Sequence, residues 1–239
     1  MNEPMKLMFS QSIYAASAVR KEQIGCLRIL ADGRKFRYCY NGAVALITGV
    51  PIATPALAAN HSNLAVVANT AVGSTTVNVT LGATAATANQ YAGGFLGINA
   101  GAGIGQQFKI DSHPAASGTA ACLIQLSEPV RVALTSAASK ATLITPNGNL
   151  VVVSAAAAET PAGVTVCAVP INYYFWSQTG GDAFCAITGT PAIGSLLTNG
   201  AAELAIMGTD TTHNEPLVGI LTREAGADAE AGPVRLVLD

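Results

Sequence analysis

The stretch Ile24–Tyr40, with the sequence IGCLRILADGRKFRYCY, decides the fold of this chain. Two runs of strand-forming residues flank Asp32 and Gly33, and glycine tolerates the positive φ that a tight hairpin turn demands. Because side chains alternate between the faces of a strand, the second run has an aromatic face and a basic face. The aromatic face holds Phe36, Tyr38 and Tyr40, joined by Arg34, and the basic face holds Lys35 and Arg37. We therefore expect a β-hairpin here.

Short strand-like runs separated by turns continue to the end of the chain. In Thr75–Leu81, Val and Leu alternate with Thr and Asn, as in a strand with one buried face. Turn residues recur at Pro146-Asn147-Gly148 and at Asn199-Gly200. Short strands at this spacing, with hardly any helical pattern, predict a mainly β chain whose body is an antiparallel sandwich or barrel of jelly-roll-like type.

The chain divides into three expected segments. Residues 1–22 form an N-terminal arm, extended or as a short helix, which is useful only if it docks onto something. Residues 23–154 form a β-rich body, and residues 164–239 form a β-rich C-terminal part. The Ala-rich stretch 155–163 is interpreted as a linker, although one continuous β domain is the alternative.

The composition indicates a protein that makes contacts. Half of the 239 residues are hydrophobic, yet only 5% are aromatic and only 11% are charged. A typical soluble domain carries about 25% charged residues. Such a chain exposes a small-residue, neutral surface, which is tolerable when another subunit covers it.

The net charge of −2 argues against a nucleic-acid partner, which usually meets a basic patch. Charge is nevertheless uneven along the chain. Residues 1–40 hold seven basic and three acidic residues, a balance of +4, and the remainder holds five and eleven, a balance of −6. This asymmetry allows head-to-tail pairing between neighbours, and the alternative is ordinary solvated charge.

The motifs that carry chemistry are missing. There is no GxSxG nucleophile elbow and no GxxxxGK[ST] phosphate loop, and Gly101–Gly105 lacks the spacing of a dinucleotide loop. The three His residues lie far apart, which disfavours a metal site. No two of the five Cys have CxxC spacing, so we expect free thiols in a reducing compartment. No apolar run is long enough to span a bilayer. We therefore predict no enzyme, no metal, no cofactor and no membrane partner.

Contact residues are predicted in three places. Leu7 and Phe9 would anchor the arm, and the hairpin supplies charged and aromatic side chains. The run Asn172–Trp176 is the densest aromatic cluster, with Tyr174 and Trp176 on one face, although both of its faces can instead be core. The candidate interface residues are Leu7, Phe9, Arg34, Lys35, Arg37, Tyr38, Tyr174 and Trp176.

Three passages together resemble a known class of protein. They are Ala31–Tyr38 with Gly42-Ala43 and the apolar run to Gly49; Tyr91–Ile98 with Gly105–Ile110 and Ser112-His113; and Tyr173–Gly181 with Pro216–Ile220 and Val234–Leu236. This pattern, which covers most of the chain, resembles the small virion proteins that decorate or cement the capsids of tailed bacteriophages.

The resemblance implies a β-rich protein, often a homotrimer, bound to the major capsid protein on the outside of the virion and clamping neighbouring capsomers. It implies synthesis in the cytoplasm of the host bacterium, no direct contact with nucleic acid, and no catalytic residues to transfer. The alternatives are another head or tail component of a phage, and a secreted β-rich domain that binds carbohydrate or adheres. The secreted domain would need an export signal and paired cysteines, which this sequence lacks.

Overall fold

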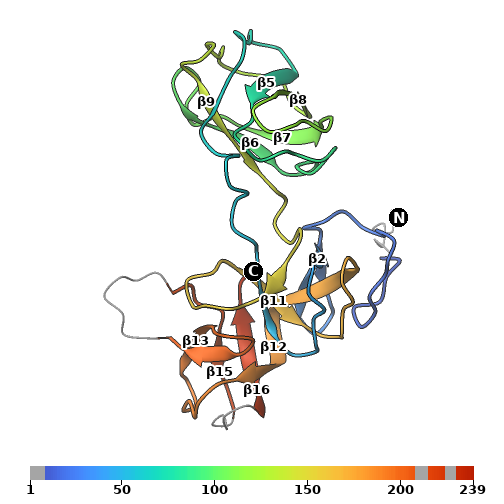
Figure 1. Ribbon diagram of the computed structural model, residues 1–239. Helices are drawn as coiled ribbons and strands as arrows, with labels where there is room; N and C mark the ends of the chain where they lie inside the picture. Colours follow the sequence, from blue (N-terminus) through green and yellow to red (C-terminus); the bar gives the residue numbers. More distant parts are fainter. Residues whose placement is uncertain (1–8, 208–214, 224–229) are drawn as a thin grey trace, which may run out of the picture. The chain divides into compact units, whose positions relative to one another are not determined.

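The computed structural model of the protein describes residues 9–207, 215–223 and 230–239 (Figure 1). In these ranges all regular structure is β-strand, and no helix occurs. The strands form barrel-like and sandwich-like arrangements, so the predicted mainly β fold is confirmed. No described element could cross a bilayer as a helix.

The chain folds into two compact units. Unit 1 consists of residues 1–55 and 147–239, and unit 2 consists of residues 56–146. This division differs from the predicted boundary at 155–163, which lies inside unit 1. The reason is a long-range pairing, in which Pro51 lies opposite Val164 on neighbouring strands. Unit 2 is thus an insertion into unit 1, and the order of residues along the chain does not reveal such an insertion.

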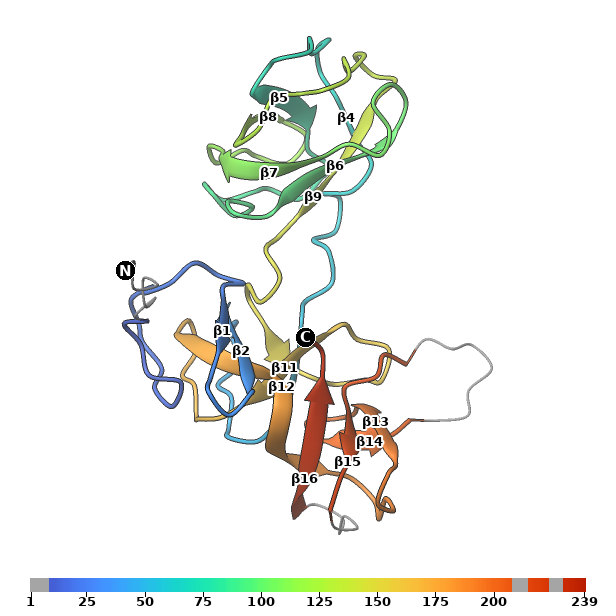
Figure 2. The same cartoon turned by 180° about the vertical axis from the view of Figure 1, so that it is seen from behind.

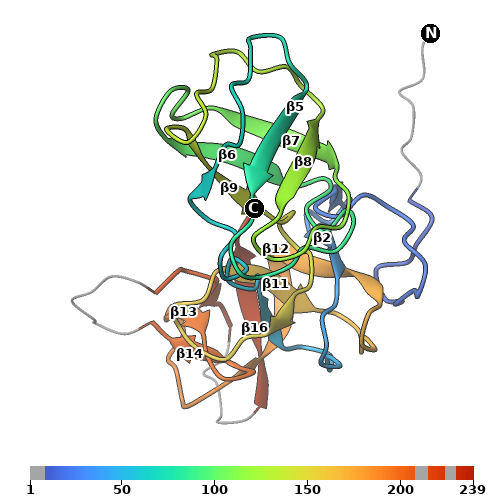
Figure 3. The same cartoon turned by 45° about the horizontal axis from the view of Figure 1, so that its top comes forward.

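Unit 2 is a closed barrel. Its strands are β4 (Leu64–Ala65), β5 (Thr76–Thr80), β6 (Phe95–Ala100), β7 (Gln107–Ser112), β8 (Ala121–Leu126) and β9 (Lys140–Ile144). They pair in the order β4-β9-β6-β7-β8-β5, and β5 and β8 lie side by side in Figure 3. A bridge between Val66 and Val79 joins β5 back to β4. Closure leaves no long unpaired strand edge in this unit.

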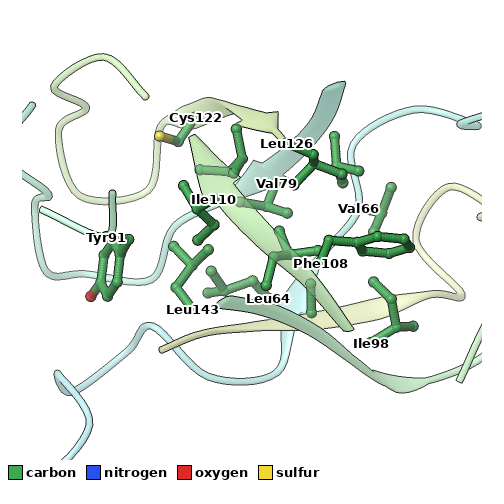
Figure 4. Packing of buried hydrophobic residues seen from close by; sticks show 14 of the residues in the cluster. Leu64, Val66, Val79, Tyr91, Ile98, Phe108, Ile110, Cys122, Leu126 and Leu143 are labelled. Atoms are coloured by element: carbon green, nitrogen blue, oxygen red, sulfur yellow. The ribbon is translucent and has the colours of Figure 1, made fainter. Parts of the chain in front are cut away.

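The barrel of unit 2 encloses a single apolar core (Figure 4). Alternation along the strands selects its members, since Val77 and Val79 of β5 are fully buried while the threonines and asparagine between them are half-buried. Phe108 and Leu143 face the same interior from β7 and β9. Each fully buried side chain of this size stabilises the fold by about 1.5–3 kcal/mol.

Unit 1 is organised around one long strand. Its strands are β1 (Leu27–Ile29), β2 (Lys35–Tyr40), β3 (Pro51–Ala53), β10 (Val152–Val153), β11 (Pro161–Thr165), β12 (Tyr174–Ile187), β13 (Leu196–Asn199), β14 (Leu204–Ile206), β15 (Gly219–Leu221) and β16 (Glu230–Val237). The first half of β12 pairs with β2 and β11, and the second half pairs with β16 and β14 (Figure 2). Because β13 and β15 link β14 to β16, the second half of β12 closes a small ring.

Two glycines mark the point where β12 changes partner from β2 to β16. The pairing with β2 shifts register between Gln178 and Gly180. Gly181 has a φ of +79°, and a Cβ there would lie 3.0 Å from the Cα of Arg34. A side chain at Gly181 would therefore be strained by the backbone conformation and crowded by the backbone of Arg34.

The predicted hairpin is present, and the described part of the N-terminal arm packs against unit 1. Leu27 pairs with Arg37 across the predicted β1–β2 hairpin, which is confirmed, and Gly33 adopts a φ of +84° in the turn. Within residues 9–22 the arm has no helix and docks on unit 1 of its own chain. There Ser17 forms a bridge with Tyr174 and Ile13 is buried.

Candidate interaction surface

The aromatic residues predicted to meet a partner instead meet one another. The rings of Tyr38 and Trp176 lie 5.0 Å apart, and Phe9 of the arm packs edge-on against Trp176 at 5.1 Å. Tyr174 stacks on Tyr38. We call Phe9, Tyr38, Tyr174 and Trp176 the aromatic cluster. Tyr38 and Trp176 are fully buried, so these two side chains have no surface for a partner.

Gln11 explains why this face of the hairpin is covered. Its side-chain amide donates to the carbonyl oxygens of Ala15 (2.6 Å) and Tyr174 (2.9 Å), and its Oε1 accepts a hydrogen bond of 2.6 Å from the Tyr38 hydroxyl. The same hydroxyl accepts from the backbone N–H of Lys21, and burial raises the pKa of Tyr38. The described part of the arm is therefore built into unit 1. Leu7 lies outside the described residues.

The predicted basic residues are largely paired within the chain. Arg34 contacts Asp32 at 2.8 Å, and Arg37 donates two hydrogen bonds to the Asp239 carboxylate, at 2.9 and 2.6 Å. This bidentate pairing lowers the pKa of Asp239. Lys35 is half-buried, and no ion pair involves it among the described residues. The hairpin therefore presents much less free positive charge than its composition indicates.

A surface that the sequence did not single out lies on two neighbouring loops of unit 1. The loops 41–50 and 166–173 run antiparallel, and Leu46 and Val169 exchange backbone hydrogen bonds of 2.9 and 2.8 Å. Leu46 and Val169 are buried, while the residues beside them point outward; Ile47, for example, is 67% exposed. We call the exposed residues of these loops the loop patch: Ala43, Val44, Ala45, Ile47, Thr48, Ala168, Pro170, Ile171 and Asn172.

The buried side chain of Asn41 links the two loops by hydrogen bonds. Its buried side-chain amide donates to the carbonyl oxygen of Val44 at 2.8 Å and to that of Pro170 at 2.9 Å. The backbone N–H of Asn172 adds a bond to the carbonyl of Gly42. A surface fixed in this way loses little conformational entropy when a partner covers it.

The loop patch lies in a part of the chain without charge. No Asp, Glu, Lys or Arg occurs from residue 41 to 108, or from 160 to 181. Interface cores are depleted in charged residues, and contiguous apolar patches on monomers often mark interaction sites. The two charge-free runs were visible in the sequence. What was not visible is that residues over 120 positions apart lie side by side.

Reactive groups are scattered in the described part of the chain. No group of three His, Cys, Asp or Glu converges there as a metal site would require. All five cysteines are free, and burial raises the pKa of every one of these thiols, that of Cys39 to about 12. These thiols are therefore protonated at neutral pH, and a protonated thiol is a poor nucleophile.

Comparisons with protein-family models, with curated proteins and with solved structures found no match to this chain. The function must therefore be argued from the residues and their geometry.

Proposed function

We propose that this chain is a structural protein of a phage virion, which binds the outside of the capsid and stabilises contacts between capsomers. The observation that carries the proposal is the loop patch, which is exposed, rigidly held and free of charge. Such a surface favours a protein partner of matching apolar character. The resemblance of the three sequence passages to cement proteins supplies the kind of partner, the major capsid protein.

The proposed role requires affinity for the assembled capsid and does not require a catalytic residue. A protein that binds only the assembled shell stabilises that shell by mass action, by about 2.7 kcal/mol per site when its free concentration is 100 times Kd. Repetition over a symmetric lattice multiplies a modest contact energy. The closed barrel of unit 2 suits such crowding, because paired strands do not template edge-to-edge aggregation.

We further propose that the chain acts as a homotrimer, is made in the host cytoplasm and ends on the capsid surface. Five free cysteines suit synthesis in a reducing compartment. Sedimentation of the purified chain tests the oligomeric state, for which we expect three times the 24.1 kDa chain mass. A monomer at all concentrations would contradict the trimer.

The decisive experiment is rebinding of purified chain to particles from which it has been stripped. Ile47→Lys places a charge in the loop patch, and we expect it to weaken binding by at least about tenfold, because a buried unpaired charge is costly. Ile193→Lys is the matched control, since Ile193 is also in unit 1, is 60% exposed and lies outside the loop patch. Equal binding by both variants would remove the loop patch from the proposal.

Electron cryo-microscopy of the native particle tests the location. Density for the chain on the outer face of the shell, in regular copy number, is the expected result. Density confined to the tail would overturn the cement function and favour the alternative of a tail component.

A further inference from the structure

Unit 1 carries a second surface feature, a groove of about 1050 Å³ beside the turn of the hairpin and the second half of β12. Of the loop patch residues, only Thr48 also lines the groove. The groove is therefore largely a separate site, and the proposed capsid contact does not account for it.

Two exposed aromatic side chains line the groove. Phe184 is 69% exposed, because it alternates along β12 with Cys185, which fills the core of the ring. Tyr14 of the arm is also exposed, and its hydroxyl accepts a hydrogen bond from Arg34 at 3.1 Å, which holds the phenol in place. An open aromatic ring is an apolar platform on which a flat C–H-rich surface can stack.

Among the described residues, the groove is lined by equal numbers of positively and negatively charged side chains. They are two arginines and two aspartates: Arg34, Arg223, Asp32 and Asp182. Asp32 accepts from Arg34 at 2.8 Å, and Asp182 accepts from Arg235 at 3.1 Å, so both carboxylates are held by a neighbour yet keep free lone pairs. A balanced set of planar donors and acceptors suits a neutral ligand rich in hydroxyl groups better than a polyanion or polycation.

The floor of the groove disfavours an extended peptide. Strand β12 pairs with both β2 and β11 at Gln178. Further along, it pairs with β16 at Phe184, and the Ala186 N–H donates to the Gly49 carbonyl at 2.8 Å, so little free strand edge is left to which a peptide could add. The Gln178 amide donates within the strand, to the carbonyls of Gly180 and Asp182. The groove can therefore bind a ligand by stacking on its aromatic rings and by hydrogen bonds from its side chains.

We propose that this groove binds a neutral oligosaccharide, whose C–H faces stack on Tyr14 and Phe184 and whose hydroxyls meet the Asp and Arg side chains between them. This inference goes beyond the proposed capsid function and does not depend on it, because it rests on different residues. A particle that carried the chain would gain affinity for glycan-bearing surfaces.

The test is an array of immobilised oligosaccharides, both neutral (hexoses and N-acetylhexosamines) and anionic (sialylated and sulfated), followed by titration of the tightest binder. We expect retention of neutral members by the wild-type chain and a loss of at least about tenfold in affinity for Phe184→Ser. Ile193→Ser is the control, matched in unit and exposure. Because Phe184 is exposed, both variants should keep the wild-type melting temperature.

Three results would overturn the inference: no neutral oligosaccharide retained at millimolar concentration, binding confined to anionic members, or equal binding by wild type and Phe184→Ser. A peptide array run in parallel provides a fourth. If extended peptides bind the groove and no neutral oligosaccharide does, the groove is a protein-binding site. Shell rebinding of Phe184→Ser, measured separately, keeps a failure here distinct from a failure of the capsid function.

Discussion

The backbone N–H of Tyr91 donates a hydrogen bond of 3.0 Å to Nε2 of His113 inside the barrel of unit 2. A nitrogen that accepts cannot carry a proton, so His113 must be the Nδ1–H tautomer. Its Nδ1 then donates to the carbonyl of Pro114 at 2.9 Å. The Tyr91 hydroxyl in turn contacts Nδ1 of His61, whose Nε2 lies 2.9 Å from the Thr84 carbonyl.

This network predicts opposite tautomers for the two buried histidines. Because each carbonyl accepts a hydrogen bond from its histidine, the neutral ring of His61 should carry its hydrogen on Nε2 and that of His113 on Nδ1. Long-range ¹H–¹⁵N correlation spectra distinguish the two forms directly. The same tautomer at both positions would contradict the hydrogen-bond assignment.

Alkaline pH should destabilise unit 2 through Tyr91. Burial raises the pKa of this phenol to about 12, whereas in the unfolded chain it is about 10. The contribution of Tyr91 to stability is therefore complete below about pH 10 and is lost as the pH rises through about 12, because the unfolded chain ionises first.

Urea unfolding between pH 8 and pH 12 checks this prediction. The methyl signals of Val77 and Val79 in β5 report on unit 2, because the single Trp lies in unit 1. Tyr91→Phe lowers stability at every pH, because His61 loses its partner, but it should flatten the alkaline slope. An unchanged slope in Tyr91→Phe would exclude Tyr91 as its source.

Deleting residues 1–22 should weaken unit 1 itself. The deletion removes Phe9 of the aromatic cluster, together with Gln11 and Ile13, which contact it, and uncovers Trp176. We expect a loss of at least about 2 kcal/mol in the free energy of unfolding, from exposed apolar area and the orphaned Tyr38 hydroxyl. Trp fluorescence should shift to longer wavelength. Unchanged emission and stability would mean that the arm only rests on the surface.

Trp176 should tolerate Phe far better than Ala. Its Nε1 is buried without a hydrogen-bond partner in the described structure, so Phe removes a costly polar group while keeping most of the ring volume. We expect Trp176→Phe to cost less than about 2 kcal/mol and Trp176→Ala about 3–5 kcal/mol. Urea unfolding monitored by circular dichroism measures both. Equal costs would indicate a hydrogen bond to the indole.

Asn41→Ala should loosen the loop patch without changing its exposed residues. The substitution removes the donor to the Val44 and Pro170 carbonyls, at a cost of about 1–3 kcal/mol. Amide exchange in 42–48 and 167–172 should accelerate, and rebinding to stripped particles should weaken. Faster exchange with unchanged rebinding would show that rigidity of the loop patch is not needed.

The sequence alone determined the features that depend on near neighbours. Asp32-Gly33 set the hairpin because a turn needs a residue that tolerates positive φ, and Gly33 adopts it. Alternation in Thr76–Thr80 set which side chains of that strand are buried, because successive side chains point to opposite faces. Both effects act within a few residues and can be read from local pattern.

Only the tertiary structure decided which surfaces are covered and which are free. The arm covers Tyr38 and Trp176, although their aromatic pattern fitted an interface equally well. The pairing of Leu46 with Val169 creates the loop patch, and that of Pro51 with Val164 makes unit 2 an insertion. Such pairings depend on which distant segments best satisfy each other's backbone hydrogen bonds and bury each other's apolar faces, and a single sequence carries no local mark of that choice.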